Sequence, residues 1–211
     1  MALEPDVGLS FASRQVFRRP LLRSVPNIVN LHDGLLPAYA GLSATSFSLY
    51  EGRAESGFTY HHMAEAVDAG PILLQGSVPV APTDALRDVI DRKRALAVES
   101  LPRVLDLVAA GSRGTPQRGS GSYFSEGPTL TLIRVEEPAS LASTELERRI
   151  RAFGAVRLPT STGPLWVTSA RRDPGFLLPE VETADVRLYV DRVAGMPALV
   201  HRGARALRSM R

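Results

Sequence analysis

Asn30, His32 and Asp68 supply an amide, an imidazole and a carboxylate, which are groups that can catalyse acyl transfer to an amine. Asn30 and His32 stand two residues apart at the end of the apolar run Ile28–Leu31, which predicts a buried strand. Side chains two apart on a strand project to the same face, so we expect both groups to point together. There they can donate hydrogen bonds to the oxyanion that develops when an amine attacks an acyl carbon.

Asp68 follows His32 by 36 residues, in the turn sequence Asp68–Pro71. We expect its carboxylate to orient His32, to keep the imidazole protonated and to help remove the proton from the attacking nitrogen. This chemistry needs no serine or cysteine nucleophile, and the sequence contains no cysteine. An Asn-x-His pattern alone equally describes a plain strand end that leads two polar residues into a loop, so the surrounding elements must decide.

The first half of the chain alternates between strand and helix patterns, which predicts an α/β fold with a parallel sheet. Expected strands or extended segments cover Asp6–Phe11, Ile28–Leu31, Gly57–Met63, Ile72–Gln75 and Val78–Val80. Expected helices cover Phe17–Leu22, Leu42–Glu51 before Gly52, and a long segment that Thr83 caps, Pro102 kinks or splits, and Gly111 ends. In such sheets the chemistry lies beyond the carboxyl ends of the strands, where Asn30, His32 and the turn with Asp68 are expected.

Residues 113–121 are rich in Gly, Ser and Pro, which predicts a linker between a catalytic domain at 1–112 and a second domain at 122–211. We expect the second domain to be small and mostly β, with one helix at 144–153 that starts with a Thr144–Glu147 capping box. Its expected strands lie at 129–135, 165–167, 186–190 and 198–201, and Trp166 is expected in the core. The predicted fold class is therefore α/β, a partial Rossmann-like parallel sheet followed by a small mostly β domain.

The formal net charge of +3 is unevenly distributed along the chain. Residues 1–112 carry a net charge of −2 and residues 113–211 a net charge of +5, which permits contact of the second half with RNA. Arginine predominates throughout, with Lys93 as the only lysine, and this bias is equally explained by genome composition. The sequence has no run of about 18 apolar residues and no secretory signal pattern, so we expect a cytoplasmic protein without a membrane span.

The four histidines offer weaker alternatives. His61 and His62 are adjacent in an expected strand, so they point to opposite faces and are not expected to share a metal. His61 is expected either to line the site or to be structural, whereas His62 and His201 are expected to be structural. No His, Asp or Glu cluster has the spacing of zinc ligands and cysteine is absent, so we expect no metal. The sequence also lacks a Gly-x-Gly-x-x-Gly motif for a dinucleotide.

Two segments resemble the signature of a known family. Residues 30–41, Asn-Leu-His-Asp-Gly-Leu-Leu-Pro-Ala-Tyr-Ala-Gly, are similar to the formyltransferase motif Asn-x-His-x-Ser-Leu-Leu-Pro-x-Tyr-x-Gly. Residues 57–70 resemble the Gly-x-Thr-x-His strand and the Asp-x-Gly turn of the same family. Over about residues 5–112 the chain is thus identified as a member of the folate-dependent formyltransferases, which include methionyl-tRNA, glycinamide ribonucleotide, amino-sugar and natural-product enzymes. Residues 146–153 resemble, more weakly, the start of the C-terminal domain of the methionyl-tRNA and sugar enzymes.

The resemblance implies formyltetrahydrofolate as the formyl donor and Asn30, His32 and Asp68 as the catalytic trio. It implies that the pterin lies between two segments, with Phe11, Ala12, Ser13, Arg14 and Val16 on one side and Glu65 and Val67 on the other. It also places His61 and Tyr39 on the substrate side. The expected acceptor is a primary amine on a small or carrier-bound molecule, such as a nucleotide-linked amino sugar or a natural-product amine. Methionyl-tRNA is the alternative acceptor.

The sequence departs from the family pattern at Gly34, where serine is usual, and at Ala40, where arginine is common. The family also has roughly 70–80 residues before the point that matches Met1, and these carry further strands of the doubly wound sheet. Without such strands, we expect the strand at Asp6–Phe11 to have an unpaired edge. We therefore expect either an oligomer or a partner that completes the sheet, or a truncated inactive remnant or binding module.

Overall fold

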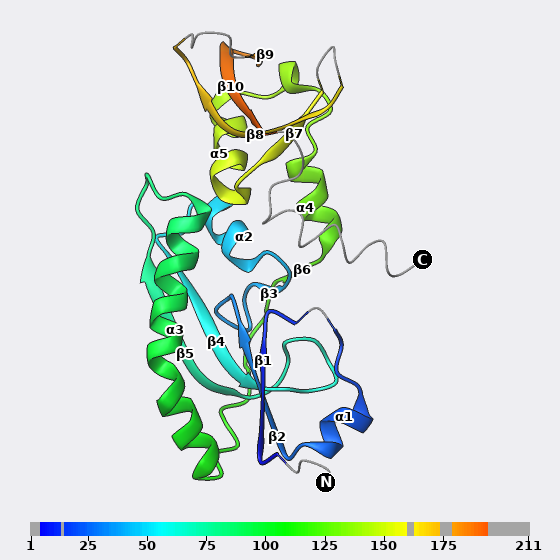
Figure 1. Cartoon of the computed structure of the whole chain (residues 1–211), viewed down its shortest axis with the longest axis vertical. Helices are drawn as coiled ribbons and strands as arrows, with labels where there is room; N and C mark the ends of the chain where they lie inside the picture. Colours follow the sequence, from blue (N-terminus) through cyan, green and yellow to red (C-terminus); the bar gives the residue numbers. More distant parts are fainter. Residues whose placement is uncertain (1–4, 14, 160–162, 174–178, 194–211) are drawn as a thin grey trace.

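The computed structural model describes residues 5–13, 15–159, 163–173 and 179–193. Two four-stranded sheets lie toward opposite ends of the long axis of the molecule, with helices α2 (Ala44–Tyr50) and α4 (Glu126–Ile133) between them (Figure 1). Within the described ranges, no helix is long and apolar enough to cross a membrane. The chain therefore has the mixed α/β character that the sequence predicts.

The first sheet has the strand order β1-β2-β4-β5. Its strands are β1 (Val7–Phe11), β2 (Asn27–His32), β4 (Glu55–His62) and β5 (Ile72–Pro79). β1 and β2 pair in parallel, as predicted, whereas β4 pairs antiparallel with both β2 and β5. β5 reverses direction because only a short loop, residues 63–71, joins it to β4, and a parallel neighbour requires a longer crossover. On its other side, β1 has no strand partner among the described residues.

Helix α3 (Leu86–Ala109) runs along one face of this sheet (Figure 1). Buried side chains of β2 and β4 pack against buried positions of the helix. These core residues are Val29, Phe58, Tyr60, Ala97, Val104 and Val108. The hydroxyl of Tyr60 also donates to the backbone oxygen of Ala97 at 2.9 Å, so the helix is fixed to the sheet by a buried hydrogen bond.

The start and course of α3 differ from the sequence-based expectation. The helix begins at Leu86, so the predicted cap at Thr83 is wrong. Instead, the carboxylate of Asp88 accepts the backbone N–H of Ala85 at 2.9 Å. Pro102 does not split the helix, which was one of the two predicted outcomes, and packing of Val104 onto the sheet holds the turn that follows.

The shorter elements lie close to their predicted positions. Helix α1 (Arg19–Ser24) begins two residues later than expected, with Pro20 in its first turn, where proline is tolerated. Helix α2 is shorter than predicted and is followed by Gly52 at φ +70°, in the expected left-handed conformation. The short strand β3 (Ala40–Gly41) pairs in parallel with β6 (Tyr123–Phe124), which connects the two halves of the chain.

The segment predicted as a linker lies against the first sheet. Thr115 and Ile72 exchange two backbone hydrogen bonds, of 2.7 and 2.8 Å. The side chain of Gln117 donates to the backbone oxygens of Asp68 and Gly70 at 2.6 and 2.8 Å. These contacts hold the segment beside the loop after β4. The division of the chain into domains at residues 113–121 stays a prediction.

Residues 126–133 form helix α4, so the strand predicted at 129–135 is wrong. The alternating Thr-Leu-Thr-Leu pattern favours a strand, but Glu126 and Pro128 in the first turn favour a helix. Helix α5 (Ser143–Phe153) lies close to the predicted 144–153. Its start is held by Asp185, which accepts from the backbone and the hydroxyl of Ser143, rather than by the predicted capping box.

The second sheet has the strand order β7-β8-β10-β9, and all neighbours are antiparallel. Its strands are β7 (Val156–Leu158), β8 (Leu165–Arg171), β9 (Glu180–Glu182) and β10 (Arg187–Val193), with the 3-10 turn η1 (Pro138–Ser140) before α5. Strands predicted at 165–167 and 186–190 are present. The strand predicted at 198–201, with His201, lies outside the described residues.

One apolar cluster joins the two halves of the chain. Phe47 of α2 packs with Ile90 of α3, Ile133 at the end of α4 and Phe153 of α5. The rings of Phe47 and Phe153 meet edge to face, with centroids 5.6 Å apart. The shared core fixes α4 and the second sheet beside the carboxyl end of β2, where Asn30 and His32 lie.

Candidate active site

The structure brings Asn30, His32 and Asp68 to one edge of the first sheet, where β2 ends and the loop after β4 begins. Nδ1 of His32 lies 3.4 Å from Oδ2 of Asp68. The other carboxylate oxygen, Oδ1, lies 3.7 Å from Nε2 of His61, and Nδ2 of Asn30 lies 3.1 Å from the same His61 nitrogen. The four side chains thus form one polar group around the Asp68 carboxylate. His61 is 1% exposed and His32 7% exposed, so both imidazoles are nearly out of contact with water.

The ring nitrogens of His32 have different partners. Nε2 lies 2.7 Å from the backbone oxygen of Tyr39, so this nitrogen carries the proton and donates it to the carbonyl. Burial lowers the pKa of His32 below its ordinary value and outweighs the opposing effect of Asp68. Burial thus opposes the expected effect of Asp68, and the expectation that Asp68 keeps His32 protonated stays a prediction.

The Asp68 carboxylate is held in its ionised form. Burial by itself raises the pKa of Asp68, but the neighbouring imidazoles of His61 and His32 and a backbone donor together hold it below its ordinary value. That donor is the N–H of Gly41, which lies 2.8 Å from Oδ2. Asp68 has a left-handed backbone with φ +51°, and the side chain of Gln117 donates to its backbone oxygen. The carboxylate is thus held by Gly41 and the backbone of the same residue by Gln117.

The loop after His32 packs so tightly that residue 34 has no room for a side chain. A Cβ atom on Gly34 would lie 2.8 Å from the backbone oxygen of Tyr39 and 2.9 Å from Nε2 of His32. The hydroxyl of Thr59 donates to the backbone oxygen of Gly34 at 2.6 Å and accepts the N–H of Leu36 at 3.1 Å. Glycine, where the family usually has serine, thus lets the loop close directly onto the His32 ring.

Lys93 of α3 lies beneath the same loop and is 1% exposed. Its ammonium group donates to the backbone oxygen of Asp33 at 2.7 Å, the hydroxyl of Thr45 at 2.6 Å and the backbone oxygen of Gly57 at 3.0 Å. Burial lowers the pKa of Lys93 to about 8. Sequence reasoning missed this residue, although a single lysine among apolar positions of a helix is a signal for a buried charge.

The polar group lies on the wall of a cleft of about 580 Å³. Residues that line it include Asn30, His32, His61 and Asp68, together with Ala12, Ser13, Val16, Glu65 and Val67 of the predicted donor site. Two further predicted residues are not among the lining residues: Phe11 is 49% exposed beside the cleft, and Arg14 lies outside the described residues. The two segments that the resemblance implies for the pterin thus meet at one cleft.

The side chain of Tyr39 does not reach the cleft, although it was expected on the substrate side. Its hydroxyl donates to Glu51 at 2.5 Å and accepts from Nε of Arg53 at 2.7 Å. Its ring stacks beside Phe124, with centroids 5.8 Å apart. Only the backbone oxygen of Tyr39 contacts the site, through His32. Tyr39 has a left-handed backbone, with φ +58°, and its carbonyl and its side chain point to different parts of the molecule.

The opposite wall of the cleft comes from the second half of the chain. It includes Tyr123, Thr129, Arg134 and Trp166. Trp166 was expected in the core, but it is only partly buried and packs at the edge of the shared apolar cluster. Sequence reasoning missed this wall because it depends on how the second sheet packs against α2 and α3. No group of three His, Cys, Asp or Glu side chains suited to a metal occurs in the described part of the chain.

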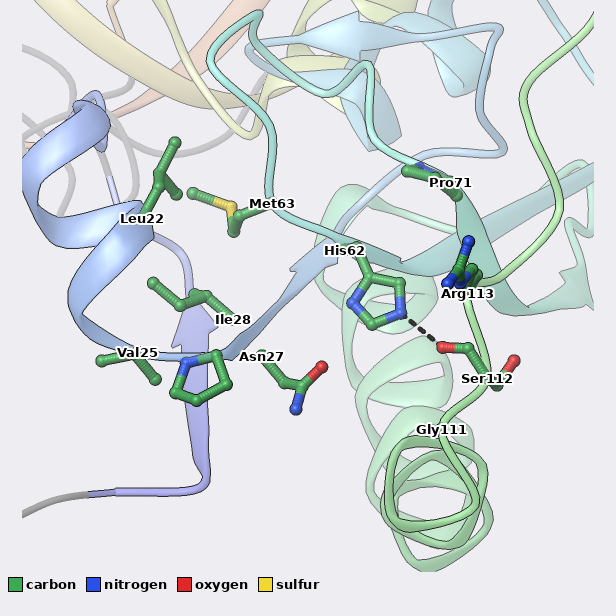
Figure 2. Close-up of a pocket in the computed structure, with 11 residues that line it drawn as sticks. Leu22, Val25, Asn27, Ile28, His62, Met63, Pro71, Gly111, Ser112 and Arg113 are labelled. Atoms are coloured by element: carbon green, nitrogen blue, oxygen red, sulfur yellow. Dashed lines mark hydrogen bonds between the residues drawn. The ribbon is translucent and has the colours of Figure 1, made fainter.

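His62 points away from this cleft, as expected from its place next to His61. Its Nε2 lies 2.9 Å from the backbone oxygen of Ser112, beside a second, open cavity of about 430 Å³ (Figure 2). Figure 2 shows Leu22, Ile28 and Arg113 around this cavity. Asn30, His32 and Asp68 do not line this second cavity. His61 and His62 therefore lie at different cavities, His61 at the cleft and His62 at the second cavity.

Comparison with known proteins gives the chain its family. The family model for formyl transferases matches residues 1–105, which include the whole polar group around Asp68. The chain belongs to the formyltransferase family. The match also covers the Gly34 loop and the strand that carries His61, so the site lies within the part of the chain that defines the family.

Two curated relatives show the range of formyltransferases to which the chain is similar. It is 35% identical over 151 residues to GDP-perosamine N-formyltransferase of Brucella melitensis biotype 1, covering 71% of this chain and 57% of that protein. It is 33% identical over 159 residues to methionyl-tRNA formyltransferase of Trichlorobacter lovleyi, covering 73% of this chain and 49% of that protein. The chain thus spans about half the length of the curated relatives it matches.

Solved structures show the formyltransferase fold over most of the chain. A sugar N-formyltransferase from Shewanella sp. superposes with a TM-score of 0.68 at 23% identity, covering 78% of this chain and 69% of that one. At this identity the likeness establishes the fold.

Proposed function

We propose that this chain transfers a formyl group from formyltetrahydrofolate to the primary amine of a nucleotide-linked amino sugar. One observation carries the proposal: Asn30, His32 and Asp68 line a single cleft in a chain of the formyltransferase family. Because the chain spans only part of the length of its relatives, its independent activity belongs to the proposal.

The cleft suits a flat, folate-sized donor. Its volume falls within the roughly 300–1,000 Å³ of pockets that bind drug-sized ligands. Val16 and Val67 are 59% and 50% exposed and both line it, so they offer apolar contacts to a ring system. Ser13 and Glu65 supply polar groups beside them. When bound, formyltetrahydrofolate supplies the formyl carbon that the amine attacks.

The geometry divides the chemistry between a hydrogen-bond donor and a proton acceptor. In the transfer, the amine nitrogen bonds to the formyl carbon and loses a proton. The bond from that carbon to the donor's nitrogen breaks, and that nitrogen gains a proton. The amide of Asn30 can donate to the formyl oxygen as negative charge develops there. Since Nε2 of His32 donates to the Tyr39 carbonyl, we assign the oxyanion contact to Asn30.

His32 and Asp68 present two acceptors to the attacking amine. Nδ1 of His32 and Oδ2 of Asp68 are 3.4 Å apart, so an N–H group of the amine can donate to either atom. The ionised Asp68 favours the positive charge that develops on the nitrogen during attack. Neutral His32 can then accept the proton. We therefore assign proton removal to the His32–Asp68 pair.

The identity of the acceptor rests on the comparisons. A nucleotide-linked amino sugar is supported by the relative named for GDP-perosamine. Methionyl-tRNA is the second candidate, supported by the relative named for that acceptor and by the net charge of +5 on residues 113–211.

A formylation assay tests both candidates. The purified chain is incubated with formyltetrahydrofolate and either nucleotide-linked amino sugars or charged initiator tRNA, and products are identified by mass spectrometry. An N-formyl sugar supports the proposal, and formylated methionyl-tRNA supports the second candidate. Absence of both products contradicts both acceptors. A cooperative thermal melt that shifts on addition of a folate separately contradicts the inactive-remnant alternative.

A further inference from the structure

Arg134, Arg157 and Trp166 form a row across neighbouring backbone segments of the second sheet. Arg134 pairs with Arg157 in an isolated parallel bridge, and Arg157 pairs with Trp166 in the β7–β8 ladder. Directly paired residues project their side chains to the same face of a sheet. The row therefore presents two guanidinium groups and one indole side by side. Sequence separation hides the row, because its members are 23 and 9 residues apart.

This row lies on the face of the second sheet that is turned away from its core, and half-buried Arg157 lies beside the cleft without lining it. The flanking residues Val135, Val156 and Val167 are buried in that core, so the row lies on the opposite face. Arg134 and Trp166 both line the cleft that also contains Asn30, His32 and Asp68. A ligand in this cleft can thus contact the row at one end and the trio at the other.

The two arginines are free to bind an anion. Among the described residues, neither Arg134 nor Arg157 forms a side-chain hydrogen bond or an ion pair. The neighbouring carboxylate of Glu145 is occupied by Arg149 and by the hydroxyl of Tyr50, each at 2.7 Å. Glu126 also lines the cleft, but the length of α4, about 12 Å, separates its position from Arg134.

We propose that Arg134, Arg157 and Trp166 form a subsite for the nucleoside diphosphate of the acceptor. Guanidinium groups bind phosphate oxygens in bidentate geometry, and an indole stacks on a nucleobase. Two phosphates beside one aromatic ring match two arginines beside Trp166. The subsite deepens the proposed function, because a nucleotide held there directs the attached amino sugar along the cleft toward Asn30 and His32. Its binding step, however, requires no formyl transfer.

The single tryptophan of the chain makes the subsite directly measurable. Trp166 is the only source of tryptophan fluorescence, so quenching on titration with GDP or UDP reports binding at this residue. We expect saturable quenching that inorganic pyrophosphate competes away and that a nucleoside without phosphates does not reproduce. Arg134→Ala and Arg157→Ala should each weaken nucleotide binding by about tenfold or more, as for loss of a charge-assisted contact.

Arg171→Ala is the matched control, since Arg171 lies on the same strand β8 and pairs with Asp191 at 2.7 Å. Circular dichroism checks the fold of each variant, and Arg134→Lys, which keeps the charge but loses the bidentate fork, replaces any variant that does not fold. No quenching by a nucleoside diphosphate, or equal binding in wild type and both arginine variants, overturns the subsite. Quenching by tRNA alone also overturns it and indicates an RNA surface.

Folate binding is measured separately, from the shift of the thermal melt. If the chain does not bind folate but a nucleoside diphosphate still quenches Trp166, the proposed function is contradicted and the subsite is supported. If the chain binds folate and formylates the sugar but nucleotides do not quench Trp166, the proposed function is supported and the subsite is contradicted.

Discussion

The side-chain amide nitrogen of Asn30 lies 3.1 Å from Nε2 of His61. The other ring nitrogen of His61, Nδ1, lies 2.8 Å from the backbone oxygen of His62, so Nδ1 carries the proton. Nε2 is then an acceptor, and it receives one N–H of the Asn30 amide. His61 thereby fixes the rotation of the amide, and the second N–H of Asn30 keeps a defined direction.

His61→Leu should therefore lower turnover, because the Asn30 amide loses the acceptor that orients it. We expect a fall of about tenfold or more in kcat, with a smaller change in KM for the donor. Steady-state kinetics with both substrates measure the two parameters. His62→Ala is the matched control, since His62 faces the second cavity (Figure 2). Equal rates in wild type and His61→Leu contradict the orienting role.

Asn30→Ala, His32→Ala and Asp68→Asn should each lower turnover by about a hundredfold or more, as for loss of an oxyanion donor or an acid–base group. Asp68→Asn keeps the shape of the side chain but removes the charge that favours the attacking amine. Single-turnover rates at saturating substrate isolate the chemical step. Asp91→Asn on the exposed face of α3 is the control. A rate close to wild type in any of the three variants contradicts its assigned role.

Gly34→Ser should destabilise the loop that holds His32, even though serine is usual in the family. The new Cβ atom meets the Tyr39 carbonyl and the His32 ring at distances of 2.8 and 2.9 Å. We expect a loss of about 1–3 kcal/mol in the free energy of unfolding, typical of overpacking, together with lower activity. Urea denaturation measures the loss.

Gly127→Ala in α4 is the control for Gly34→Ser, because a Cβ atom on Gly127 would meet open space, with nothing within 4 Å. It should stabilise the protein by about 0.5–1 kcal/mol, the usual gain of alanine over glycine in a helix. If Gly34→Ser were as stable as the wild type, the loop would have more freedom than its packing indicates.

Lys93 should make folding stability depend on alkaline pH. Burial lowers its pKa to about 8, while in the unfolded chain the value is 10.5. Between these values the unfolded chain holds a proton that the folded chain has released. Stability therefore rises with pH in this window, by up to about 1.4 kcal/mol per pH unit. Below pH 8 the stability contribution of Lys93 is at its minimum.

Urea denaturation between pH 8 and 9.5 measures how the free energy of unfolding changes with pH. The rise due to Lys93 should be present in the wild type and absent in Lys93→Met. Tyr39, whose pKa burial raises to about 12, acts in the opposite direction only near pH 10 and above. Because Lys93 is the only lysine, an amine-specific reagent should label its side chain only upon unfolding. Rapid labelling of the folded protein contradicts the buried position.

The sequence by itself determined the residues of the trio and the elements that present them. Asn30 and His32 share a face because a strand places every second side chain on the same side, and this local rule needs no tertiary information. The strand positions of the first sheet and helix α5 likewise follow from local periodicity and turn residues. The motif around Asp68 was also readable, because it depends on residue types at fixed spacing.

Only the tertiary structure decided the direction in which the pKa of His32 is shifted, the direction of the Tyr39 side chain and the composition of the far wall of the cleft. The pKa of His32 depends on burial, which neighbours distant in sequence impose. Tyr39 turns away because Glu51 and Arg53 bind its hydroxyl. The antiparallel direction of β4 and the helix at 126–133 also escaped prediction, since strand pairing and core packing override local pattern. The row of Arg134, Arg157 and Trp166 exists only through the register of paired strands.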